Sequence, residues 1–158
     1  MSFLSYILLS YIKCLNLTTR EIILQELDML DISIDTNRTL LSEILFTLKA
    51  LRNSVAHNNI IFDTRFKDRK INTVLKKWVE KETGIQNITL YSLVDYIIII
   101  CCLLKRIDFT GMRAQNLLAT YKRENQNLQN AVTTSIYNVI MQQSVPTKIN
   151  LLESYLNK

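Results

Sequence analysis

The sequence predicts an all-α fold, in one domain over residues 1–158, from three observations. The chain has two glycines and one proline, whereas a β-rich fold needs many tight turns built from these residues. Hydrophobic residues make up 48% and charged residues 21%, close to ordinary globular composition. Apolar residues recur every three or four positions, as in amphipathic helices. Together these features predict a compact bundle of about six to seven helices.

Three helices are predicted in the first part of the chain. The first covers residues 2–15, and the second starts at Thr18, where Thr18 and Glu21 form a capping-box pattern. Residues 31–37 are polar at alternate positions and connect to a third helix over 38–56. That helix has the clearest amphipathic spacing in the sequence.

The middle of the chain begins with a stretch that has no helical period. Residues 58–68 are therefore predicted to form a loop. A helix containing Trp78 follows, and Gly84 is its predicted C-terminal stop. Asn87 or Thr89 is the predicted cap of the next helix.

That next helix runs to Ile107 and is apolar on nearly all sides, so we expect it at the centre of the fold. Its apolar run over 96–104 is too short to cross a bilayer, which needs about 20 residues. Cys101 and Cys102 lie in this run, and we expect them to be buried and inert. This use of cysteine fits a reducing cytoplasm, and no membrane association is expected.

The last part of the chain alternates between helical and polar stretches. Residues 108–111 break the central helix, and a further helix covers 112–125. The Asn- and Gln-rich segment 123–130 is predicted to be a kink or a short loop. A helical stretch over 136–140 follows, is interrupted by Pro146, and gives way to a short tail helix.

The net charge of +5 is concentrated in one segment. Between Arg52 and Lys77 there are seven basic and two acidic residues, whereas the rest of the chain has twelve of each. Localised positive charge attracts polyanions, chiefly nucleic acid. A solvated basic face is the alternative interpretation.

The only histidine, His57, closely follows Arg52 and Asn53 at the end of the third predicted helix. Imidazole suits proton transfer near neutral pH, and guanidinium offers a fixed fork for a phosphate. Cleavage of RNA by its own 2′-hydroxyl needs a group that transfers protons and a group that stabilises the charge on the phosphate. His57 and Arg52 are therefore candidate catalytic groups, and Asn53 is a candidate as the polar residue directly beside Arg52. The candidate RNA contacts are Arg65, Lys67, Arg69 and Lys70.

The spacing supports this pairing in part. Asn53 and His57 are four residues apart and share a helix face, whereas Arg52 and His57 are separated by roughly 140° around an ideal helix. Two arrangements bring them together. Either the helix ends near Ala56 and frees His57 to turn, or two copies of the helix meet across a twofold interface.

A structural interpretation of these residues is also open. His57 at a helix C-terminus interacts favourably with the helix dipole, and Arg52 has Asp63 as a nearby acidic partner in sequence. A second alternative is a non-catalytic module in which the same basic face binds RNA or a protein. A third possibility is a dimer whose Arg and His side chains only join the two copies.

No cofactor or metal site is predicted. The chain has one histidine, no CxxC spacing and no Gly-rich phosphate loop. Tyr91 and Tyr96 flank Asp95 on the predicted central helix, and such residues are usually part of the core.

The string LRNSVAHN, which contains the three candidate residues, is followed by Phe62, Asp63 and Arg65. It resembles the LRNxxAH region of the bacterial abortive-infection (Abi) family of phage-resistance proteins. Its Arg and His also match the R-x4-6-H motif of HEPN-domain proteins. The resemblance covers roughly residues 3–105.

The resemblance implies a metal-independent endoribonuclease that acts as a homodimer. In that family, the residues matching Arg52 and His57 form the catalytic pair, and Asn53 matches the polar residue often beside the arginine. The implied products are a 2′,3′-cyclic phosphate, or its opened form, and a 5′-hydroxyl. The implied setting is phage abortive infection, or a toxin held by a protein or RNA antitoxin.

Overall fold

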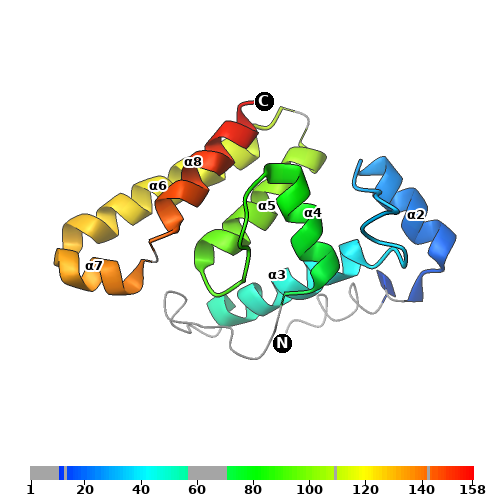
Figure 1. Ribbon diagram of the computed structural model, residues 1–158, viewed down its shortest axis with the longest axis horizontal. Helices are drawn as coiled ribbons and strands as arrows, with labels where there is room; N and C mark the ends of the chain where they lie inside the picture. The colour runs from blue at the N-terminus through cyan, green and yellow to red at the C-terminus, as the bar shows by residue number, and fades with distance from the viewer. Residues whose placement is uncertain (1–10, 13, 57–70, 109, 142) are drawn as a thin grey trace.

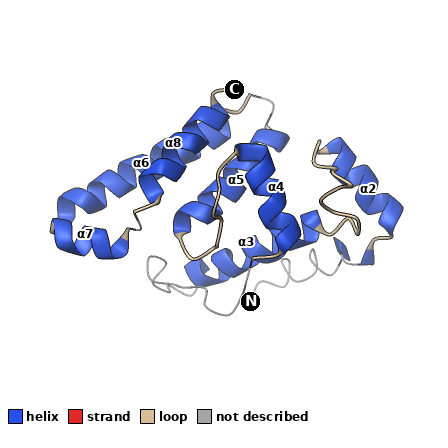
Figure 2. Ribbon diagram, in the orientation of Figure 1, coloured by secondary structure: helices blue, strands red, loops and turns tan. Residues whose placement is uncertain are grey.

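The all-α prediction is confirmed. The computed structural model describes residues 11–12, 14–56, 71–108, 110–141 and 143–158. Within these ranges the chain forms seven helices and no strand (Figures 1 and 2). The helices are α2 Leu17–Glu26, α3 Leu40–Ala56, α4 Thr73–Thr83, α5 Leu93–Ile107, α6 Met112–Ala131, α7 Thr134–Ile140 and α8 Val145–Leu156. Of the helix predicted over 2–15, four residues are described: Tyr11, Ile12 and Cys14 are helical, whereas Leu15 forms a bend.

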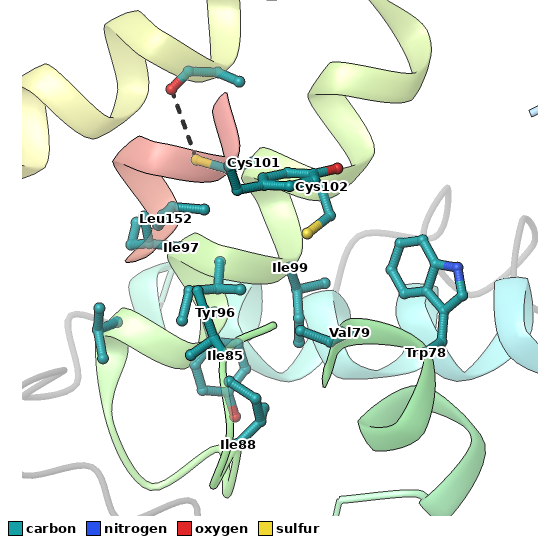
Figure 3. Packing of buried hydrophobic residues seen from close by; sticks show 14 of the residues in the cluster. Trp78, Val79, Ile85, Ile88, Tyr96, Ile97, Ile99, Cys101, Cys102 and Leu152 are labelled. Atoms are coloured by element: carbon teal, nitrogen blue, oxygen red, sulfur yellow. Dashed lines mark hydrogen bonds between the residues drawn. The ribbon is translucent and has the colours of Figure 1, made fainter. Parts of the chain in front are cut away.

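Helix α5 is the centre of the bundle, as its apolar sequence predicts. Eight of its residues are buried, and it packs against α3, α4, α6 and α8. Figure 3 shows Tyr96, Ile97 and Ile99 of α5 surrounded by apolar side chains from other segments. Full burial of an aliphatic side chain stabilises the fold by about 1.5–3 kcal/mol, so this helix supplies much of the hydrophobic free energy.

The start of α2 differs from the predicted capping box. Asn16 is the N-cap, and its side-chain oxygen accepts a hydrogen bond of 2.8 Å from the backbone N–H of Thr19. Glu21 instead forms an ion pair of 2.9 Å with Arg38, at the other end of the connection between α2 and α3. The prediction at Thr18 was therefore wrong, because asparagine directly before the helix supplies the cap more readily.

Helix α4 begins and ends as its sequence indicates. The Asn72 side chain accepts a hydrogen bond of 2.8 Å from the N–H of Val74. Gly84 adopts the left-handed conformation with φ of 75°, and its N–H donates to the carbonyl of Glu80 at 2.9 Å. The predicted stop at Gly84 is confirmed.

The start of α5 lies several residues later than predicted. Its N-cap is Ser92, so neither Asn87 nor Thr89 caps it. The Asp95 carboxylate in the first turn accepts hydrogen bonds from the N–H groups of Thr89 at 3.0 Å and Leu90 at 2.9 Å. This carboxylate therefore satisfies backbone N–H groups of the loop before the helix, and the helix starts only after that loop.

The C-terminal third is more helical than its composition indicates. Helix α6 continues through the Asn- and Gln-rich segment to Ala131, so the predicted kink over 123–130 is wrong. Pro146 lies in the first turn of α8, where its missing N–H costs little, and it starts a helix instead of interrupting one. Helix α8 runs alongside α6 and buries six residues, so it is part of the core (Figure 1).

Candidate functional site

Helix α3 has one face in the core and one face in solvent. Its buried residues include Ile44, Thr47 and Ser54, which lie against the rest of the bundle. Near its C-terminal end, Arg52 is exposed and Val55 is 51% exposed. The candidate arginine therefore lies on the outer face of the helix, available to a ligand.

Arg52 and Asn53 are in direct contact. The Arg52 Nη1 group donates a hydrogen bond of 3.2 Å to Oδ1 of Asn53, whose side chain is half-buried. Guanidinium has five N–H donors, and this contact uses one of them. Among the described residues no other partner of Arg52 is found. Asn53 thus orients the guanidinium, and none of the other described residues engages its remaining donors.

The other candidate residues, His57, Arg65, Lys67, Arg69 and Lys70, lie outside the described residues. So does Asp63, the acidic partner considered for Arg52, as does the loop predicted over 58–68. Helix α3 is described up to Ala56, the residue before His57. The distance between Arg52 and His57 therefore stays a prediction.

Two further members of the basic segment are described. Lys76 and Lys77 lie in the first half of α4, which packs beside α3 (Figure 1). Lys76 lies 3.8 Å from Glu80, and Lys77 is exposed. The described part of the segment thus places cations on two neighbouring helices.

A buried ion pair between α5 and α8 was not predicted from the sequence. Lys148 Nζ donates to Asp95 Oδ1 at 2.6 Å and to the backbone carbonyl of Asn87 at 2.9 Å. The Lys148 side chain is 6% exposed and that of Asp95 is 0% exposed. The sequence held a signal for this pair. Asp95 lies among the apolar residues of α5, and Lys148 lies beside Ile149 in α8.

A second polar cluster joins α4, α5 and α8. Glu82 accepts hydrogen bonds of 2.6 Å from both Tyr155 Oη and Arg106 Nη2, and Arg106 also pairs with Asp28. Burial, followed by the nearby Cys102 and Glu82, raises the pKa of Tyr155. The tyrosine therefore remains a hydrogen-bond donor. Glu82, Arg106 and Asp28 also line a pocket of about 240 Å³ that includes Trp78.

The predicted burial of Cys101 and Cys102 is confirmed. Cys101 and Cys102 are fully buried, and burial raises the pKa of Cys101 to about 12. The Cys101 thiol donates to the carbonyl of Ala114 on α6, as Figure 3 shows. Asp95 and Tyr96 are part of the core as expected, but Tyr91 is 47% exposed because it precedes α5.

Within the described ranges, no group of three or more His, Cys, Asp and Glu side chains is placed to hold a metal ion. None of the helices described combines the length and the apolar run that a bilayer crossing requires. Comparison of the chain with protein-family models, with curated proteins and with solved structures gave no match.

Proposed function

We propose that this protein is a metal-independent endoribonuclease that cuts RNA with Arg52, Asn53 and His57. The observation that carries the proposal is the exposed Arg52 guanidinium, held by Asn53 on the outer face of α3. In the sequence it precedes the only histidine of the chain by five residues. The resemblance of LRNSVAHN to the Abi and HEPN motifs supports the same assignment.

In the proposed reaction, the 2′-oxygen of a ribose attacks the adjacent phosphorus and the bond from phosphorus to the 5′-oxygen breaks. His57 moves protons at these oxygens, taking one from the 2′-hydroxyl or giving one to the departing 5′-oxygen. Arg52 stabilises the negative charge that grows on the phosphate oxygens. The products are a 2′,3′-cyclic phosphate and a 5′-hydroxyl, and no water or metal ion is consumed.

The basic segment supplies the RNA contacts in this proposal. In this proposal the phosphate backbone is bound by Arg65, Lys67, Arg69 and Lys70. Lys77, which is exposed on α4, belongs to the same basic segment of the sequence. Such contacts release counterions, so binding weakens as salt concentration rises. A homodimer brings two copies of the motif to one cleft. Phage abortive infection, or a toxin with a protein or RNA antitoxin, is the proposed setting.

The test is an RNA cleavage assay in EDTA with the wild type and with Arg52→Ala, Asn53→Ala and His57→Ala. We expect Arg52→Ala and His57→Ala to lower the rate about 100-fold or more, the usual contribution of such groups. The matched control is Arg123→Ala, which removes an exposed arginine of α6. Mapping of the 5′ fragments should detect 2′,3′-cyclic phosphate ends. Equal cleavage by the wild type and His57→Ala overturns the assignment.

A non-catalytic binding module is the alternative, favoured by the cations on α3 and α4. It predicts salt-sensitive RNA binding with the RNA left intact. Val55, exposed on the same face as Arg52, favours a further alternative, in which this face only joins two copies of the chain. In that case Arg52→Ala changes the oligomeric state, and RNA does not bind.

A further inference from the structure

A pocket of about 240 Å³ lies between the turn that follows α2, helix α4 and the last turn of α5. Its volume is below the roughly 300–1,000 Å³ of pockets for drug-sized ligands, so it suits a smaller molecule. Arg52 is not part of its lining, so the pocket is separate from the candidate RNA site on α3. The three elements contribute residues 28–31, Trp78, Lys81, Glu82 and Arg106.

One part of the lining is apolar and belongs to the core. Met29 and Trp78 are 3% and 4% exposed and are members of the buried cluster, and Leu30 packs against that cluster. Figure 3 shows the Trp78 indole at one side of the labelled core residues. Trp78 is also the only tryptophan in the chain. A ligand in the pocket therefore meets an apolar surface that the core holds in place.

The rest of the lining carries both signs of charge. Arg106 pairs with Asp28 and donates a hydrogen bond of 2.6 Å to Glu82. Lys81 donates one of 2.5 Å to Asp31. The side chains of Asp28 and Lys81 are 87% and 67% exposed. Exposed ion pairs contribute little to stability, so a charged ligand can replace one partner of such a pair at small cost.

We propose that this pocket binds a free α-amino acid with an apolar side chain. The carboxylate of the ligand pairs with Lys81 and Arg106, and its ammonium group pairs with Asp28 and Asp31. Its side chain lies against Trp78. In an α-amino acid a single carbon separates the two charged groups, so a site for it must offer cations and carboxylates side by side, as this lining does.

Ligands of other charge fit the lining less well. An anion is repelled by three carboxylates, and a cation is repelled by the ammonium and guanidinium groups beside them. An uncharged apolar molecule gains contact with Trp78 but separates charged pairs without replacing their partners. The inference concerns a second site and does not depend on ribonuclease activity.

The test is a titration of the full chain with L-leucine and with L-methionine, without RNA. The fluorescence of the single tryptophan reports on this pocket, and calorimetry measures the dissociation constant independently. We expect saturable binding of both amino acids. Isocaproate lacks the amino group of leucine, and isoamylamine lacks its carboxylate. Each should bind roughly tenfold or more weakly than leucine, because each loses one set of charge-assisted hydrogen bonds.

Variants of the two most exposed charges of the pocket test which groups hold the ligand. Lys81→Met and Asp28→Asn should each weaken leucine binding roughly tenfold or more. Both side chains are exposed, so neither change should unfold the chain, which circular dichroism verifies. The matched control is Lys122→Met, because Lys122 also forms an exposed ion pair but does not line this pocket. Its affinity for leucine should equal that of the wild type.

Three outcomes overturn this inference. One is the absence of binding by both methods up to about 10 mM amino acid, a concentration at which even weak ligands bind. Another is binding of isocaproate or isoamylamine as tight as that of leucine, since the pocket then does not use both charges. The third is unchanged leucine binding in both Lys81→Met and Asp28→Asn. Because no RNA is present, failure of the ribonuclease proposal leaves each of these results interpretable.

Discussion

Lys148 on α8 and Asp95 on α5 form an ion pair of 2.6 Å, and both side chains are almost completely buried. The two residues are 53 positions apart in the sequence, so the pair fixes α8 against the start of α5. Lys148 also donates to the carbonyl of Asn87, and Asp95 also accepts from the N–H groups of Thr89 and Leu90. One polar contact therefore joins the C-terminal helix, the central helix and the loop before it.

Removal of Lys148 should destabilise the fold strongly. Lys148→Met leaves the Asp95 carboxylate buried without its cation, which should lower the free energy of unfolding by about 3–5 kcal/mol in urea titrations. The double variant Asp95→Asn with Lys148→Met removes both charges and should be more stable than the sum of the two single changes predicts. Lys122→Met, which breaks an exposed pair with Glu153, is the control and should cost at most about 1 kcal/mol. A cost below about 1 kcal/mol for Lys148→Met would contradict the structural role of the pair.

Gly84 should be needed for its backbone conformation alone. A Cβ added there meets no atom within 4 Å, but φ of 75° is unfavourable for any residue that carries a Cβ. Gly84→Ala should therefore lower the free energy of unfolding by about 1–2 kcal/mol. Gly84→Asn should cost less, because asparagine adopts the left-handed region more readily. Equal losses for the two variants in urea titrations would argue against backbone strain as the cause.

Thiol reactivity should separate the three cysteines. Cys14 is exposed, whereas Cys101 and Cys102 are buried, and burial raises the pKa of both thiols. Since the thiolate is the reactive form, a thiol reagent at pH 8 should label one cysteine in the native protein and three in denaturant. Mass spectrometry of the labelled peptides identifies the native site. Rapid native labelling at Cys101 would show that the core opens readily.

The ion pair of Asp31 should make stability depend on pH. A hydrogen bond from Lys81, then one from Ser33, lowers the pKa of Asp31 to about 2. Because the folded pKa lies below the unfolded value of about 3.9, the contribution of Asp31 is present at neutral pH and is lost as pH falls from about 4 through 2. Asp31→Asn should therefore be less stable than the wild type at pH 7, and the difference should become small as pH falls to 2 and below.

Salt and a second carboxylate test this interpretation of Asp31. The Lys81 side chain is 67% exposed, so 1 M NaCl should reduce the difference at pH 7. Glu26→Gln removes an exposed carboxylate of α2 that has no ion pair in the described part of the chain, and should change stability little. A difference between Asp31→Asn and the wild type that persists unchanged at pH 2 would rule out ionisation as its source.

The sequence by itself determined the helical class, the central position of α5, the stop at Gly84 and the burial of Cys101 and Cys102. These features depend on local properties, namely apolar periodicity and the conformational freedom of glycine, which are visible within a few residues. It also identified Arg52 as a candidate site residue, and the structure places Arg52 in solvent beside Asn53.

Only the tertiary structure decided which polar groups meet across the bundle. The Asp95 carboxylate accepts hydrogen bonds from the loop before α5 and from Lys148 on α8, and no local pattern in the sequence revealed these contacts. The start of α5 was therefore predicted too early. Helix α6 likewise continues through an amide-rich segment, where composition favoured a break. The physical reason is the same in each case. Long-range packing and buried ion pairs compensate for weak local preferences, and their energy depends on residues far apart in the sequence.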